Sequence, residues 1–128
     1  MTSVVTKYFT PYEAEKTLPL VKKIVKDIID TSNEIKEIAE TITEKYEDNP
    51  KVIRLIENIK GFVKELEEIG CYYKEYNFIY GLVDFPAIIN NKEVFLCWRS
   101  DETGIKFYHD MEAGYMGRKI IPDEYFNN

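Results

Sequence analysis

The feature that most constrains this chain is a long apolar stripe whose members recur every three or four residues, the spacing of one helix face. The stripe is interrupted once, at Asn49 and Pro50, and stops at Gly70, a residue type that commonly ends helices. We therefore expect two helices, over residues 19–48 and 52–69, paired as an antiparallel hairpin. The stripe consists of Leu18, Val21, Val25, Ile28, Ser32, Ile35, Ala39, Ile42, Tyr46, Val52, Leu55, Ile59, Phe62, Leu66 and Ile69.

A capping signal precedes this stripe. Thr10 and Glu13 form the T-x-x-E pattern of a capping box, and Pro11 suits the first helical position. Pro19 has no N–H to continue a helix, and its ring crowds the carbonyl four residues earlier. The pattern predicts a short helix over residues 11–17 and a kink or restart at Pro19.

The two expected helices differ in length, about 45 Å for the first against about 28 Å for the second at 1.5 Å per residue. If they pair from the turn outward, the second ends opposite residue 30 and leaves the start of the first uncovered. That start is also its most apolar part, so the rest of the chain or a second protomer must cover it. The residues concerned are Leu18, Leu20, Val21, Ile24, Val25, Ile28 and Ile29.

The composition changes after Gly70, where 13 of the 18 aromatic residues lie in short alternating runs. These runs predict three or four antiparallel strands, with Pro86 at an edge or a bulge. In the middle strand, alternation predicts Val94, Leu96 and Trp98 on one face and Phe95, Cys97 and Arg99 on the other. We expect an α+β fold in which a small β-meander, residues 71–121, packs on the helical hairpin, residues 11–69, within a single domain, residues 1–128.

Length and charge restrict the classes of function. A chain of 128 residues with 45% apolar residues suits one domain with its own core. Its net charge of −6 provides no basic face, which disfavours nucleic-acid binding, and no apolar run approaches the roughly 20 residues that span a membrane. Two widely spaced cysteines and the lack of a leader favour the cytoplasm. The 14 lysines, three arginines and absence of glutamine also occur in thermophiles and in AT-rich genomes.

Four short segments, in this order along the chain, resemble a known family. They are FTPYEAEKTLP at residues 9–19, GLVDFPA at 81–87, LCWR at 96–99 and HDMEAGYMGR at 109–118. Together they resemble the bacterial and archaeal family catalogued as domain of unknown function 2203, over nearly the whole chain. Glu15 departs from the asparagine that the family leads us to expect. The resemblance implies a shared fold unit and assigns no catalytic residue.

The segment HDMEAGYMGR holds the only histidine and is the first candidate site. On a helical turn, His109 and Glu112 would share a face, and with Asp110 they form a candidate set of ligands for a divalent metal. One histidine is too few for the richer zinc sites, so this set would need a further carboxylate such as Asp84. The alternative is that His109 bonds a backbone carbonyl and the acids cap a turn. The motifs otherwise predict no cofactor.

Two further hypotheses use the same region. Cys97 and His109 would approach each other if their strands are neighbours, and an imidazolium would activate the thiol. Arg99 and Arg118, with the glycines of the G-Y-M-G turn, would suit a small anionic ligand. Each has a structural alternative, since buried cysteines usually act as small apolar residues and the arginines could pair internally with acids such as Asp84.

These patterns leave two functions open. The first is a homodimeric interaction or regulatory module, because the apolar stripe is wider than a two-helix, coiled-coil-like seam needs and the tyrosine-rich half suits an interface. The second is a small-ligand- or metal-dependent enzyme. Its pocket would use Asp84, Arg99, His109, Asp110, Glu112 and Arg118.

Overall fold

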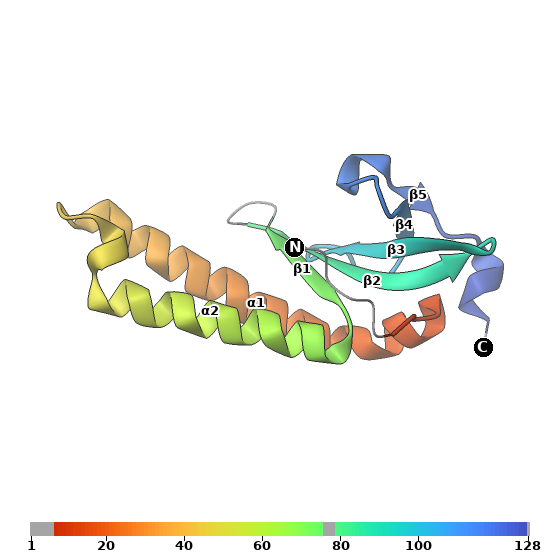
Figure 1. Cartoon of the computed structure of the whole chain (residues 1–128), viewed down its shortest axis with the longest axis horizontal. Coiled ribbons are helices and arrows are strands. Elements are labelled where there is room, and N and C mark those ends of the chain that lie inside the picture. The colour runs from red at the N-terminus through yellow and green to blue at the C-terminus, as the bar shows by residue number, and fades with distance from the viewer. Residues whose placement is uncertain (1–6, 76–78, 128) are drawn as a thin grey trace.

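The computed structural model describes residues 7–75 and 79–127, which form a helical hairpin with an antiparallel sheet at one end (Figure 1). Within these residues the α-helices are α1 (Pro11–Thr41) and α2 (Pro50–Ile69). The strands are β1 (Tyr72–Glu75), β2 (Gly81–Ile89), β3 (Lys92–Arg99), β4 (Phe107–Asp110) and β5 (Lys119–Ile120). Short 3₁₀ helices are η1 (Tyr46–Asp48), η2 (Tyr115–Gly117) and η3 (Asp123–Phe126). The expected α+β class is confirmed.

Helix α1 starts as its capping box predicts. The Thr10 side chain accepts from the N–H of Glu13 at 3.0 Å, and the Glu13 carboxylate accepts from the N–H of Thr10 at 2.9 Å. The predicted short helix over residues 11–17 with a restart at Pro19 was wrong, because α1 runs through Pro19 without interruption. Pro19 is exposed, and its cost of about 3 kcal/mol is outweighed by buried neighbours such as Leu18 and Val21, worth about 1.5–3 kcal/mol each.

The expected end of the first helix near Asp48 was also wrong. Helix α1 ends at Thr41, and Ile42 is already extended, with a ψ of 156°. A run of β-branched residues disfavours helix at this point, and the last turn holds no basic residue to offset the helix dipole. The acidic residues that follow, from Glu44 to Asp48, would make a longer helix less stable still.

The second helix is capped at both ends, and its stop at Gly70 is the one that the sequence predicts. The Asn49 side chain accepts from the N–H groups of Lys51 and Val52 at 2.9 and 3.2 Å, and Pro50 occupies the first helical position. At the other end Gly70 adopts a left-handed conformation with a φ of 111°. The sequence therefore determines the start and the end of α2.

The sheet is an antiparallel meander in the order β1-β2-β3-β4-β5. The prediction of three or four strands was wrong, because the described residues form five. The strand β5 has two residues, and its Ile120 and Lys119 pair with Phe107 and Tyr108 of β4. Two residues are too few for an alternating pattern to appear in the sequence.

One face of the sheet packs on the N-terminal half of α1 (Figure 1). The β half therefore covers most of the apolar start of the helix, as expected, although Leu20 remains 53% exposed. This packing also confirms the predicted alternation of β3, whose Val94, Leu96 and Trp98 belong to the core. The core formed by these elements contains Ala14, Leu18, Val21, Ile24, Val25 and Ile28 of α1, together with Val83, Phe85, Ala87, Ile89, Val94, Leu96 and Trp98 of the sheet.

Pro86 lies where no described strand pairs with the outer side of β2. Strand β1 pairs with β2 only from Gly81 to Asp84 and so ends before Pro86. The Pro86 carbonyl accepts instead from the N–H of Phe9, at 2.7 Å. Pro86 therefore occupies an edge position, as expected.

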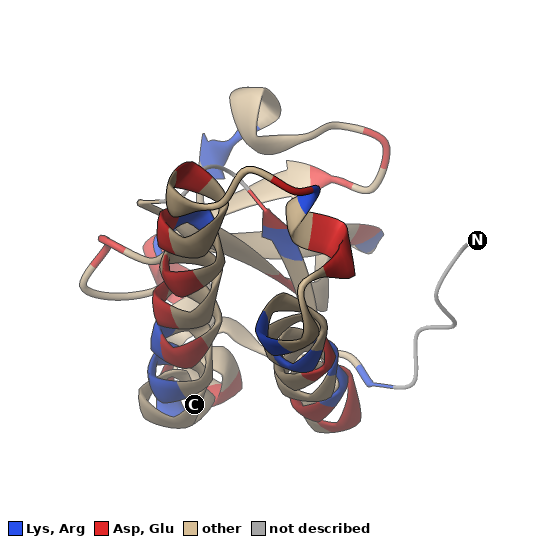
Figure 2. Cartoon of the chain, turned by 90° about the vertical axis from the view of Figure 1, so that its left-hand side faces the viewer, with Lys and Arg blue, Asp and Glu red and all other residues tan. Residues whose placement is uncertain are grey.

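Figure 2 views the chain from the tip of the hairpin and shows acidic and basic residues along both helices. In α1 the buried residues end at Ile28, and in α2 only Val52 and Leu66 are buried. No helix in the described part of the chain is both long enough and apolar enough to cross a membrane.

The two glycines that flank the second half of α2 provide a matched test of its C-terminal stop. Gly70→Ala places a side chain in a left-handed conformation, with its Cβ 3.3 Å from the Phe9 ring, and should lower the free energy of unfolding by about 1–2 kcal/mol. Gly61→Ala lies inside the helix with open space around its Cβ, and should raise it by about 0.5–1 kcal/mol. Urea unfolding of both variants measures the difference, and equal effects would contradict this account.

Candidate functional site

The face of the sheet opposite the helices carries three buried polar or sulfur-bearing side chains, Asp84, Cys97 and His109, each only 1% exposed. They come from three neighbouring strands. Asp84 of β2 lies directly opposite Cys97 of β3, and His109 of β4 lies opposite Phe95, two residues from Cys97. Because side chains alternate along a strand, this register places all three on one face.

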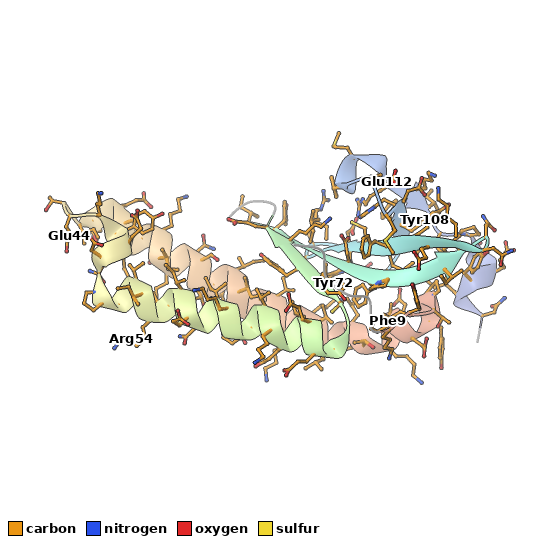
Figure 3. The ribbon with its side chains drawn as sticks, in the orientation of Figure 1. Phe9, Glu44, Arg54, Tyr72, Tyr108 and Glu112 are labelled. Carbon is orange, nitrogen blue, oxygen red and sulfur yellow. The ribbon has the colours of Figure 1, made fainter. Side chains whose placement is uncertain are left out.

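Aromatic side chains help to cover this group on the face opposite α1 and α2. The Phe95 ring lies 5.7 Å from the His109 ring, centroid to centroid. Tyr72, labelled on β1 in Figure 3, meets Phe95 edge-on at 6.5 Å. The Lys74 ammonium lies 5.8 Å from the Phe95 centroid. The β1 strand and Phe95 therefore shield polar groups that a bare sheet face would expose.

Both nitrogens of His109 have partners. Nδ1 lies 2.8 Å from the backbone carbonyl of Asp110, and Nε2 lies 3.1 Å from Asp84 Oδ1. Burial opposes charge on the ring, but the Asp84 carboxylate, the Cys97 thiol and the Asp110 carbonyl outweigh it and raise the pKa of His109 to about 10. Oxygen acceptors at both nitrogens favour the imidazolium form of the ring, which has two N–H donors.

The second oxygen of Asp84 is less well satisfied. Lys74 Nζ lies 3.0 Å from Oδ2 in an ion pair whose lysine side chain is 52% exposed. Apart from this ion pair, Oδ2 is buried and makes no hydrogen bond among the described residues. Such an atom costs stability unless another group binds it.

The two candidate arginines, Arg99 and Arg118, are directed at other partners than Asp84. Arg99 donates from Nη1 to the Tyr115 hydroxyl and from Nη2 to Asp101 Oδ2 at 2.9 Å. Arg118 donates to Glu102 Oε1 at 2.9 Å, and its guanidinium lies 4.3 Å from the Tyr115 ring centroid. The arginines therefore pair with acids of their own chain, as in the structural alternative, but with Asp101 and Glu102 and not with Asp84.

The G-Y-M-G turn also uses its own donors. The Gly117 N–H donates to the Gly114 carbonyl at 2.9 Å, and the Arg118 N–H donates to the Tyr115 carbonyl at 3.2 Å. Residues 115–117 form the 3₁₀ helix η2. These backbone groups are therefore not directed at a common anion.

The predicted metal set of His109, Asp110 and Glu112 is not brought together. The Asp110 carboxylate faces Lys92 Nζ at 3.3 Å and Lys119 Nζ at 3.6 Å. Glu112 is exposed in the turn after β4, where Figure 3 labels it. Asp110 and Glu112 instead line a surface hollow of about 350 Å³ that does not include His109.

The sequence suggested Cys97 with His109 and, in separate hypotheses, Asp84 with His109, but not that all three side chains converge. The signal was present in the strand pattern, because Asp84 interrupts an apolar run and Cys97 falls on the polar-facing side of β3. The register between strands decides whether such residues meet, and alternation alone does not give that register.

This geometry differs from that of a catalytic triad, in which a nucleophile, a base and an acid are hydrogen-bonded in series. In a catalytic triad the acid bonds one ring nitrogen and the nucleophile the other. Here the acid is at Nε2, while Nδ1 is held by a backbone carbonyl and not by a nucleophile. Instead, one carboxylate oxygen, one sulfur and one ring nitrogen of these side chains lie close together.

The family described as "Uncharacterized conserved protein (DUF2203)" matches residues 7–121. The chain belongs to this family. The DUF2203 match includes both helices, the five strands and the three converging side chains. Searches find no matching curated protein and no matching solved structure.

The raised pKa of His109 can be measured directly, since it is the only histidine and its NMR signals need no assignment. In chelator-treated protein we expect a titration midpoint of about 10. Asp84→Asn removes the charge that offsets burial, so its midpoint should fall below the ordinary value of 6.5. Asp110→Asn is the matched control, because its side chain faces Lys92 and Lys119 and its carbonyl remains. A wild-type midpoint near 6.5 would contradict the buried ion pair.

The same pair should link stability to pH. Because the pKa of His109 is raised in the folded state, its contribution is complete below the ordinary value of 6.5 and is lost as pH rises to about 10. We expect the free energy of unfolding of the wild type, relative to His109→Asn, to decrease over that range. Urea unfolding at several pH values measures it, and a difference that grows with pH would show the opposite sign.

Proposed function

We propose that this DUF2203 protein is a homodimeric interaction module whose helical hairpin provides the interface. The observation that supports this is the distal part of the hairpin, here called the arm, which consists of residues 29–41 of α1 and 50–63 of α2. The arm extends away from the sheet, and Figure 3 labels Glu44 and Arg54 near its tip. Within it, Val52 alone is buried.

The arm has an apolar seam that two helices do not cover. Ile35 and Ile38 of α1, and Leu55 and Ile56 of α2, are only half-buried although they continue the core stripe. Burying such a side chain fully is worth about 1.5–3 kcal/mol. Four-helix packing of two hairpins would cover the seam from the side that the sheet leaves open.

Charges on the arm favour a second copy as the occupant. Lys51 and Glu34 pair at 3.4 Å and mark one side of the arm, and Ile38 and Leu55 lie one turn further along the same side. The α1 edge of this side is acidic and the α2 edge is basic. A two-fold dimer that places α1 against α2 of its partner would bring opposite charges together at both edges. The acidic edge carries Asp30, Glu34 and Glu37, and the basic edge carries Lys51 and Arg54.

The alternative, an enzyme with a pocket at Asp84, Arg99, His109, Asp110, Glu112 and Arg118, has less support. Its arginines pair with Asp101 and Glu102, and its acids Asp110 and Glu112 lie apart from the His109 ring. What remains of it is the contact between Asp84 and His109.

Analytical ultracentrifugation at micromolar concentration tests the dimer. We expect a mass of twice 15.1 kDa for the wild type. Ile38→Lys adds a charge to the seam and should weaken the dimer about tenfold or more, because an unpaired charge would be desolvated there. A monomeric wild type at these concentrations would contradict the proposal.

The control is Ile88→Lys, since Ile88 is 43% exposed on β2, away from the arm, and its substitution should leave the dimer intact. Circular dichroism would show that both variants remain folded. Equal weakening by the two substitutions would place the interface outside the arm.

A further inference from the structure

The donor atoms of Asp84, Cys97 and His109 all lie within 4.8 Å of one another. Ligands of a tetrahedral zinc ion, at 2.0–2.3 Å from the metal, are separated by about 3.3–3.7 Å from each other. The 3.1 Å between Asp84 Oδ1 and His109 Nε2 is close to that range. Small shifts of side chains would therefore bring one oxygen, one sulfur and one nitrogen to a common ion.

The orientation of His109 is that of a metal ligand. A histidine that binds metal through one nitrogen usually donates the other N–H to a carbonyl or carboxylate, which fixes the ring. Here Nδ1 is held by the Asp110 carbonyl at 2.8 Å, and Nε2 lies 3.1 Å from Asp84 Oδ1. The ring is thus positioned by the backbone of its own strand.

A second observation points independently to a ligand at this site. Asp84 is 1% exposed, and its Oδ2 forms an ion pair with Lys74 Nζ at 3.0 Å but no hydrogen bond among the described residues. A buried carboxylate oxygen with an open lone pair is costly in a protein interior and is suited to binding a cation.

We propose that Asp84, Cys97 and His109 form a binding site for a divalent metal ion of the zinc class. Thiolate and imidazole select Zn²⁺ over Mg²⁺ and Ca²⁺, which prefer oxygen ligands alone. The charges balance, because the ion displaces one proton from the His109–Asp84 pair and one from the Cys97 thiol. One divalent cation replaces two protons, so the net charge beside Lys74 does not change.

The test uses Co²⁺ as a spectroscopic probe in untagged full-length protein. The protein is refolded from urea with Co²⁺ because the three side chains are closed to solvent. We expect one Co²⁺ per chain, with a sulfur-to-cobalt charge-transfer band that Zn²⁺ abolishes by displacement. Absence of the band at saturating Co²⁺, with the protein folded, would overturn the proposal whatever the variants do.

The two cysteines provide matched variants. Cys97→Ser should lose the band, while Cys71→Ser should keep it, because Cys71 Sγ contacts the Leu66 carbonyl at 3.5 Å and burial raises the pKa of its thiol to about 12. Asp84→Asn should keep the sulfur band but bind Co²⁺ about tenfold or more weakly. A band that survives in Cys97→Ser, or unchanged affinity in Asp84→Asn, would refute the assigned ligands. Circular dichroism confirms that each variant is folded.

Discussion

The rest of the structure depends on the burial of the first half of α1 against one face of the sheet. Two helices of 31 and 20 residues cannot cover each other, and the surplus apolar surface of the longer one must meet another element. Val21 and Ile28 are at most 1% exposed, and they share one core with residues of β2 and β3. This contact also stabilises the helix through Pro19. It places the sheet at one end of the hairpin and leaves the other end extended.

Because α1 covers only one face of the sheet, polar side chains such as Asp84 and His109 lie on the opposite face. A five-stranded sheet of this size has no second layer of helices among the described residues, yet Asp84 and His109 are as buried as the core. The twist of the sheet and the rings of Tyr72 and Phe95 supply the cover. A buried ion pair is poor evidence for stability, since apolar residues of the same volume usually serve as well.

The sequence predicts those features that depend on local chemistry. The cap at Thr10, the stop at Gly70 and the alternation of β3 follow from side-chain types at fixed spacing. The features that it does not predict depend on tertiary context. Pro19 remains helical because neighbours on the buried side outweigh its cost, and the arginines pair with acids only two or three residues from Arg99. The convergence at His109 depends on the register of three strands, which periodicity does not determine.

The arm and the cluster of Asp84, Cys97 and His109 lie at opposite ends of the molecule and are stabilised in different ways. The arm is held by a two-helix seam alone, so its stability is low unless a partner adds contacts. The cluster is fixed by the ladders of β2, β3 and β4, and its groups have little freedom to rearrange. A dimer through the arm would leave the outer face of both sheets uncovered. Interaction and ligand binding at Asp84, Cys97 and His109 are therefore compatible in one molecule, because neither requires surface that the other buries.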